Sequence, residues 1–300
     1  MTRQRPLHLS ITMVCVALLG YAMGALACQS LASSFYPPAP RADAFPRTPG
    51  VVRYLDPQRY LDSARYAPYY YGTMAEVFRD LQRGDTILLY GKLREEGLET
   101  PAYVTDVTIM GMGTKVRPGH TGTPSGVQGG AADWSHPNDG SAVPLLTVRS
   151  VGWAFHHLHF GGHPNASTLV LSRQGDSTEF HANHTEVVDC LFSGGLRGIE
   201  DQGGSGHILV RDSLFYRLTT AIQSTNTSVA LPLLWEIANN RFVSNTAHIV
   251  MPLSYSVVRG NVFFRSGFER PTMMQLDLRG GLNNVVVQNV DEHGVVDALR

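Results

Sequence analysis

The chain carries little charge and no excess of either sign. Charged residues make up 16% of its 300 positions, and 24 Lys and Arg face 25 Asp and Glu, for a formal net charge of −1. A nucleic-acid-binding surface needs a clustered basic face, and no basic run occurs beyond Arg3 and Arg5. The composition therefore predicts no nucleic-acid partner.

Cysteine is also scarce, with only Cys15, Cys28 and Cys190. Cys15 lies in an apolar stretch near the N-terminus, so few cysteines remain for pairing in a mature chain. This number excludes a small scaffold held together by several disulfides. Cys190 occupies an apolar position of a repeated phrase, and we interpret it as a small buried hydrophobic residue.

Residues 1–27 have the pattern of an export signal. Two arginines precede an apolar stretch over residues 11–24, and Ala25-Leu26-Ala27 forms a small-residue cleavage site. A retained anchor needs about 20 apolar residues, and the stretch is shorter. Because Cys28 follows directly, a lipoprotein-type signal is the alternative, although Ala25 stands where such signals usually carry Leu. We expect a secreted, periplasmic or outer-envelope protein that meets a membrane only through this segment or a lipidated Cys28.

Residues 28–72 are predicted to be a Pro- and Tyr-rich linker and edge segment. Pro37-Pro38-Ala39-Pro40 is typical of an extended tether. Six tyrosines follow, Tyr54, Tyr60, Tyr66, Tyr69, Tyr70 and Tyr71. We expect these rings to pack the segment onto the edge of the next domain, in preference to forming a glycan platform.

One short phrase recurs through residues 155–291. Its copies close on the aromatics Phe160, Phe192, Phe215, Phe242 and Phe263, at intervals of 32, 23, 27 and 21 residues. A period of this size indicates a solenoid, and the β-branched, aromatic, Asx and Gly content predicts strands and turns. We expect the aromatics to fill the core and the Asx residues to hold the turns.

An amphipathic helix and a strand are predicted before the repeats. Thr73 and Glu76 have the spacing of a capping box, and apolar residues follow at helical spacing. Gly84-Asp85 then leads into an apolar strand at residues 86–90, and Val107-Thr108-Ile109-Met110-Gly111-Met112-Gly113 comes next.

This order resembles the start of right-handed parallel β-helix proteins of the pectate-lyase-like superfamily. The resemblance implies an all-β fold, a right-handed parallel β-helix solenoid over residues 73–300. It also implies an N-terminal capping α-helix, because an uncovered first rung would expose apolar core and a strand edge.

Residues 114–143 are predicted to interrupt the solenoid as a surface loop insertion, because they are rich in Gly, Ser, Thr and Pro. Trp134 within them has two interpretations. An exposed indole would stack on a sugar ring, whereas a ring folded back would pack against the solenoid. The first interpretation makes Trp134 a substrate-binding candidate.

A second strand is predicted in each rung, with one inward and one outward row. The inward row is Leu169, Ile199, Ile222, Ile249 and Leu276. Side chains alternate across a strand, so the exposed row is Val170, Glu200, Gln223, Val250 and Asp277. Rungs about 4.8 Å apart would give these rows a surface that matches an extended polymer. We therefore expect a polysaccharide or cell-surface glycan as partner.

The catalytic candidates are Glu200, Asp277, Arg279 and His248, and the substrate-binding candidates are Trp134, Gln223 and Arg173. A glycosidase needs two carboxylates about 5–9.5 Å apart. Glu200 and Asp277 are three rungs, or about 14 Å, apart, which is too far for a pair. The resemblance also allows a uronate lyase, yet the Arg-x-x-Pro-x-x-Arg signature of pectate lyases and the segments typical of polygalacturonases are missing.

A metal site is the alternative use of the histidines. His156, His157, His159 and His163 cluster, and His181 and His184 follow. Neighbouring strand residues face opposite ways, and no Cys or carboxylate completes a ligand set of fixed spacing. We predict no metal and no cofactor, with Ca²⁺ as the alternative that lyases of the superfamily suggest.

Three functions stay open. We favour an exported module that binds an extended polysaccharide along its flat face. The alternative is a polysaccharide lyase or glycoside hydrolase, so whether the chain is an enzyme is undecided. The rungs are also similar to phage-associated or purely structural β-helix proteins, but an export signal argues against a virion part. Fold alone does not choose between these functions.

Overall fold

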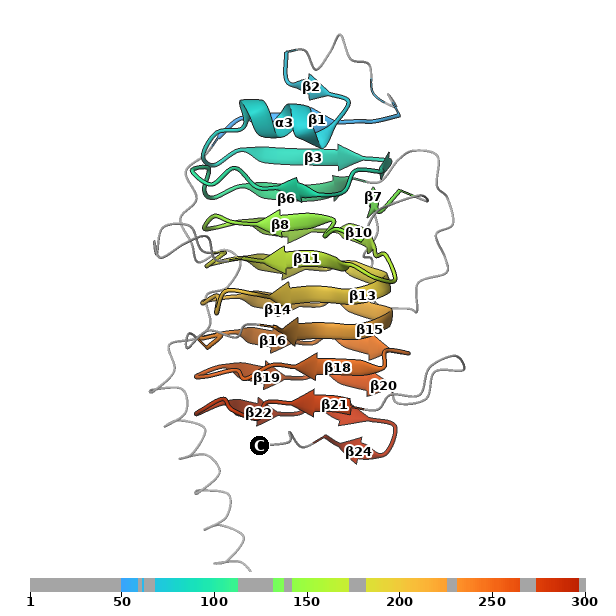
Figure 1. Ribbon diagram of the computed structural model, residues 1–300, viewed down its shortest axis with the longest axis vertical. Coiled ribbons are helices and arrows are strands. Elements are labelled where there is room, and N and C mark those ends of the chain that lie inside the picture. Colours follow the sequence, from blue (N-terminus) through green and yellow to red (C-terminus); the bar gives the residue numbers. More distant parts are fainter. Residues whose placement is uncertain are drawn as a thin grey trace, which may run out of the picture. The chain divides into compact units, whose positions relative to one another are not determined.

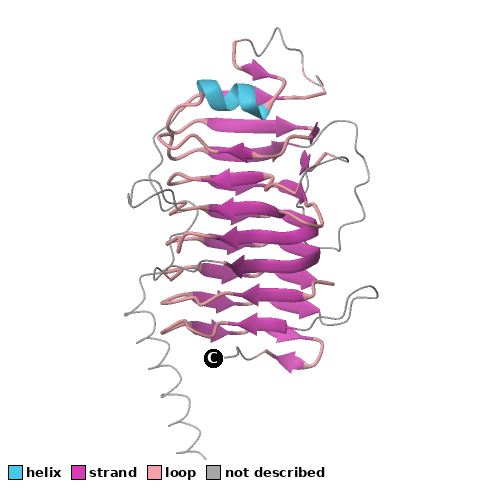
Figure 2. Cartoon of the chain, in the orientation of Figure 1, coloured by secondary structure: helices cyan, strands magenta, loops and turns pink. Residues whose placement is uncertain are grey.

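The computed structural model describes residues 50–58, 61, 68–112, 132–137, 142–172, 182–225, 231–264 and 274–296. These residues belong to one compact unit, 42–300. The expected signal segment, Cys28 and Arg173 lie outside the described residues. In the part described, strands joined by turns and loops form the architecture, with one helix, α3 (Met74–Asp80) (Figure 2). None of its helices is both long and apolar enough to span a membrane.

Parallel strands stack rung upon rung, and each full rung passes through three legs (Figure 1). The first leg is a ten-stranded sheet in the order β2-β1-β3-β6-β9-β12-β14-β16-β19-β22. Its strands are β1 (Val52–Leu55), β2 (Tyr70–Tyr71), β3 (Thr86–Tyr90), β6 (Thr108–Met112), β9 (Ala154–His156), β12 (Glu186–Val188), β14 (Leu209–Arg211), β16 (Glu236–Ala238), β19 (Val257–Arg259) and β22 (Val285–Val287).

The second and third legs share a fourteen-stranded sheet, because β13 and β15 each run through both. The second leg contains β4 (Lys92–Leu93), β7 (Ala132–Ser135), β10 (Leu158–Gly161), β13 (Leu191–Asp201), β15 (Leu214–Ser224), β17 (Arg241–Val243), β20 (Val262–Phe264) and β23 (Val290–Asp291). The third leg contains β5 (Leu98–Glu99), β8 (Leu146–Val148), β11 (Ser167–Leu171), the ends of β13 and β15, β18 (Ala247–Val250) and β21 (Met274–Asp277). Only the pairing of β24 (Gly294–Val295) with β23 is antiparallel among the described strands. The predicted all-β, parallel β-helix fold is confirmed.

The closing aromatics of the repeated phrase form a continuous stack in the core. Successive ring centroids along Phe160, Phe192, Phe215, Phe242 and Phe263 lie 4.9, 4.9, 5.0 and 4.9 Å apart. This spacing follows the separation of adjacent strands, about 4.8 Å, and all five rings are buried. The predicted inward row of the third leg, from Leu169 to Leu276, is in register and buried as well.

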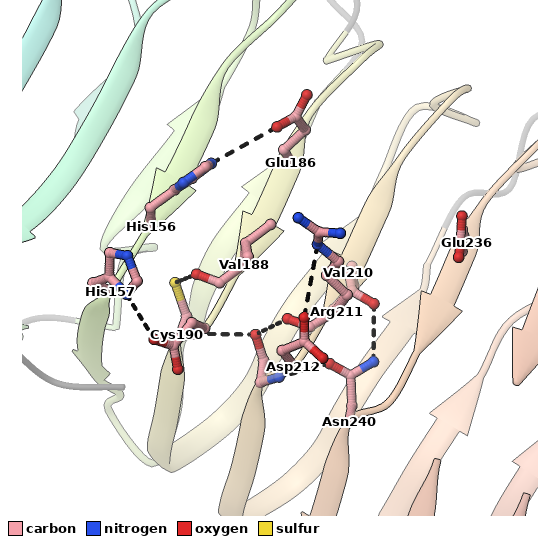
Figure 3. A network of polar contacts seen from close by, with 12 residues as sticks. His156, His157, Glu186, Val188, Cys190, Val210, Arg211, Asp212, Glu236 and Asn240 are labelled. Carbon is pink, nitrogen blue, oxygen red and sulfur yellow. Dashed lines mark hydrogen bonds and ion pairs between the residues drawn. The ribbon is translucent and has the colours of Figure 1, made fainter. Parts of the chain in front are cut away.

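The phrase itself is two short strands joined by a turn, where the sequence suggested one run. The turn residues Asp189, Asp212 and Asn239 have φ of 51°, 54° and 57°, in the left-handed region that Asx residues tolerate better than most. The following residue forms a buried ladder. Asn240 accepts from the N–H of Ser213 at 3.0 Å and donates to the carbonyl of Val210 at 2.9 Å (Figure 3). The predicted turn-holding role of the Asx residues is confirmed.

The helix begins at the predicted capping box. Thr73 accepts from the Glu76 N–H, and the Glu76 carboxylate accepts from the Thr73 N–H. Met74 and Val77 are buried, and the Phe78 ring meets the ring of Trp153 edge-on at 5.9 Å. The helix therefore packs its apolar face against the core.

The Tyr-rich segment supplies two strands that continue the first leg beyond β3. Arg53 on β1 takes an inward position opposite Ile87. Its buried guanidinium is 2.6 Å from Asp85 and donates to the Tyr71 hydroxyl and the Asp80 carbonyl, both at 2.5 Å. A charged network, rather than an apolar residue, therefore fills this end of the inward row.

Part of the predicted loop insertion is a strand of the solenoid. Residues 132–135 form β7, which pairs with β4 and β10. Trp134 is 0% exposed, with its ring 5.9 Å from that of Phe160 and its indole N–H donating to the Glu95 carbonyl. The sugar-stacking interpretation of Trp134 is wrong, because its ring offers no face to a ligand. Residues 114–131 and 138–141 of the predicted insertion lie outside the described residues.

Candidate functional site

The outward row of the third leg has the predicted order. Val170, Glu200, Gln223, Val250 and Asp277 are paired neighbours on successive strands. It is less exposed than expected, since Glu200 is 5% exposed and Asp277 8% exposed, while Gln223 and Val250 are half-buried. The row therefore presents polar groups held in place by neighbours, not freely solvated side chains.

Glu200 is the most engaged of these residues. It accepts from the Ser167 hydroxyl, from Thr225 Oγ1 at 2.5 Å and from Gln202 Nε2 at 3.1 Å. Burial favours the neutral acid, but these hydrogen bonds and the charge of Arg197 outweigh it and hold the pKa of Glu200 below its usual value. Glu200 is therefore an ionised acceptor, which is unsuited to act as a general acid.

Arg197 completes this group from the same strand. Its Nε donates to Gln223 Oε1 at 2.8 Å, and its Nη1 lies 3.5 Å from Glu200 Oε2. We call the set the recognition cluster, and its members are Ser167, Arg197, Glu200, Gln202, Gln223 and Thr225. Gln202 is exposed and Arg197 half-buried, so a guanidinium and two amides stand at the surface around a fixed carboxylate.

Asp277 and Arg279 form a separate pair further along the leg. The guanidinium donates to both carboxylate oxygens, at 2.9 and 2.6 Å. These bonds hold the pKa of Asp277 below its usual value. Asp277 is three strands from Glu200 in the register, or about 14 Å at the usual strand spacing. The two carboxylates do not converge, as the sequence predicted.

His248 is a core residue, so its nomination as a catalytic residue is wrong. It is 0% exposed and packs against Phe242 and Phe263, with ring centroids 5.6 and 5.3 Å away. Burial lowers its pKa to about 3. Such a histidine has no access to substrate and is too weak a base at neutral pH.

Two histidines of the predicted cluster, His156 and His157, lie beside carboxylates. His156 lies 3.7 Å from Glu186, and Nδ1 of His157 lies 2.6 Å from Asp189 (Figure 3). Further along this outer face of the first leg, Arg259 pairs with Glu236 at 2.6 Å. Across the described residues, no three His, Cys, Asp or Glu side chains gather in a way that could hold a metal ion. His181 lies outside the described residues.

Sequence reasoning did not nominate Arg197, Ser167 or Thr225 as site residues. Arg197 is two residues before the inward Ile199, so strict alternation along the strand would point its side chain into the core. It lies where β13 passes from the second leg to the third, and alternation does not hold through that corner. A polar residue at a predicted core position, beside Gly198, is the signal that could have marked it.

Comparison with known proteins gives the chain no sequence family: no family model matches it, and no curated protein matches it in sequence. A PL6-family alginate lyase of known structure shares 10% identity at a TM-score of 0.36 over 86% of this chain, which spans 40% of the lyase chain. The deglycosylated pectin methylesterase of Aspergillus niger shares 14% identity at a TM-score of 0.34, over 81% of this chain and 86% of its own. Likenesses this distant assign no activity, and the fold rests on the strand pairing itself.

Proposed function

We propose that this chain is an exported protein that binds an extended polysaccharide along the outward face of its third leg. The recognition cluster is the centre of that site. The supporting observation is the fixed arrangement of Arg197, Glu200 and Gln223, which hold one another across adjacent rungs.

The cluster suits a sugar because its surface groups are oriented before a ligand arrives. The Arg197 guanidinium is aligned by Gln223 and Glu200, so little side-chain freedom is lost when it binds a hydroxyl or carboxylate. Gln202 adds an exposed amide held by the same carboxylate. Successive rungs repeat about every 4.8 Å, and a periodic surface suits a periodic polymer.

Binding is favoured over glycosidic cleavage because the described residues of this face contain no acid–base pair. Glu200 is ionised, and its two oxygens accept bonds from three side chains. Asp277 is about 14 Å away and is occupied by Arg279. A hydrolase would need a second carboxyl group within about 9.5 Å.

A glycan array followed by calorimetry tests the proposal. Arg197→Ala removes a charged donor, worth about 1.5–3 kcal/mol, so the Kd for a bound glycan should rise about 10- to 100-fold. Arg259→Ala, on the outer face of the first leg, is the matched control and should leave Kd unchanged. Equal Kd values for wild type and Arg197→Ala, or no bound glycan, would reject the site. Unsaturated product absorbing at 235 nm from a uronate polymer would instead favour the lyase.

A further inference from the structure

A carboxylate, an imidazole and a hydroxyl lie next to one another on the second leg, apart from the recognition cluster. Asp133 is on β7, His159 on β10 and Ser193 on β13, three successive strands. His159 Nδ1 lies 3.4 Å from Asp133 Oδ1. His159 Nε2 lies 2.6 Å from Ser193 Oγ. One imidazole therefore connects a carboxylate on one side to a hydroxyl on the other.

The strand register produces this line. His159 is directly opposite Asp133, and Ser193 is opposite Gly161, two residues after His159. Residues two apart on a strand point to the same face, so all three side chains lie on the outward face. The imidazole reaches diagonally to the serine, a distance that long side chains cover between neighbouring strands.

The environment keeps the carboxylate charged and the serine accessible. Asp133 has a side chain only 12% exposed, held by Arg94 Nη2 at 3.0 Å and by the Ser135 hydroxyl. Burial favours its neutral form, but these bonds and His159 together hold its pKa below its usual value. Ser193 is half-buried, and the side chain of His159 is 22% exposed.

Among the described residues, nothing fills the space beside Gly194, the residue after the serine. Gly194 follows it with φ of 63°, and a Cβ placed there would meet nothing within 4 Å. The space over Gly161, opposite Ser193 on the preceding strand, is filled by the Ser135 side chain, since a Cβ at Gly161 would clash with Ser135 Oγ. A small acyl group therefore has room to approach Oγ from the Gly194 side.

We propose that Ser193 is the nucleophile of a site that hydrolyses short-chain carboxylic esters. His159 is the general base and acid, and Asp133 is a positioning residue that fixes the imidazole and stabilises its charged form. Ser193 Oγ forms a bond to the ester carbonyl carbon as His159 takes its proton. The alkoxy group then leaves as an alcohol with that proton, and water releases the acid and restores Ser193. This activity is independent of the proposed glycan binding.

Turnover of 4-nitrophenyl acetate by the full chain tests the proposal. Ser193→Ala should lower kcat/KM about 10³-fold or more. His159→Gln should lower it about 10²- to 10⁴-fold. Asp133→Asn should reduce kcat and leave KM unchanged, which a merely structural role would not produce. Ser224→Ala is the control, because that half-buried hydroxyl bonds Asp201 rather than a histidine.

A fluorophosphonate probe gives a readout that needs no variant. The wild-type protein should gain one adduct, and peptide mass mapping should place it on Ser193. Absence of both turnover and adduct in the folded wild type overturns the proposal, as does turnover that Ser193→Ala retains. Because the assay contains no sugar, its outcome is separate from that of the glycan array.

Discussion

Replacing the buried His248 by Phe should remove a large acid sensitivity from the fold. Phenylalanine keeps a ring packed against both Phe242 and Phe263 and removes the titrating group. In the wild type, burial lowers the pKa of His248 from 6.5 to about 3, against a smaller opposing effect of Glu292. Between these values the unfolded chain holds a proton that the folded chain excludes, so acid favours unfolding.

The magnitude follows from that gap. The full difference corresponds to roughly 5 kcal/mol, and about 3 kcal/mol of it should be lost by pH 4. This stability is present above about pH 6.5 and disappears as the pH falls toward 3. Carboxylates that titrate in the same range are common to both proteins and cancel in the difference between them.

Urea unfolding at pH 7.5, 6, 5 and 4 measures the effect, followed by fluorescence of the buried Trp134, Trp153 and Trp235. The free energy of unfolding of the wild type should fall toward acid by about 3 kcal/mol more than that of His248→Phe. Parallel pH profiles would show that His248 is protonated in the folded chain and would refute its burial as a neutral core residue.

Three further changes test the core and its end. Asn261→Ala should lower the free energy of unfolding by about 3 kcal/mol, because it leaves the Asn240 N–H and the Ile237 carbonyl without their partner. In the same urea titration, Asn165→Ala at an exposed position should change the free energy of unfolding by less than about 0.5 kcal/mol. Phe215→Ala interrupts the ring stack and should cost about 3–5 kcal/mol, whereas a much smaller loss in calorimetry would mean that the stack collapses around the gap. Asp85→Ala should lower the free energy of unfolding by about 3–5 kcal/mol, because it leaves Arg53 buried without its carboxylate. As the control, Arg83→Ala breaks the more exposed pair with Asp106 and should lower it by less than about 1 kcal/mol.

The repeats could be predicted because each rung repeats the same pattern of inward and outward residues. An inward residue in one rung lies on the inward residue of the next, so Leu169 to Leu276 and the closing phenylalanines follow from alternation and spacing alone. The split of the phrase into two strands was not visible. The phrase consists of a three-residue strand, one residue in the left-handed region such as Asp189, and another short strand. Its composition is the same as that of one continuous strand.

The misplaced elements depend on pairing over long distances. Trp134 lies in a Gly- and Pro-rich stretch, and only its strand's pairing with β4 and β10 turns it inward. Arg53 contradicts the apolar pattern of an inward row, and its partner Asp85 is 32 residues away. His248 was nominated as a catalytic residue, but its ring lies in the core against Phe242 and Phe263.

Only part of the candidate site could be predicted from the sequence. Glu200 and Gln223 were placed on one row by the period of two. The groups that decide the state of Glu200, Ser167 and Thr225, come from neighbouring rungs 33 and 25 residues away. Likewise, the line from Asp133 through His159 to Ser193 depends on a register that no single segment of the chain encodes.

Because of the asparagine ladder, the solenoid should tolerate the loss of rungs better at its N-terminal end than at its C-terminal end. Each Asn binds backwards: Asn261 accepts from the Asn240 N–H and donates to the Ile237 carbonyl, and Asn289 accepts in turn from the Asn261 N–H. A rung is thus completed by the one that follows it in the chain. Along this turn, deleting rungs from the N-terminal side leaves no backbone group without its partner, whereas a cut between Ser213 and Asn289 that removes the C-terminal side uncovers an N–H and a carbonyl. Beside the last asparagine of the ladder the described chain turns back, and the Val296 N–H donates to the Asn289 carbonyl at 2.9 Å.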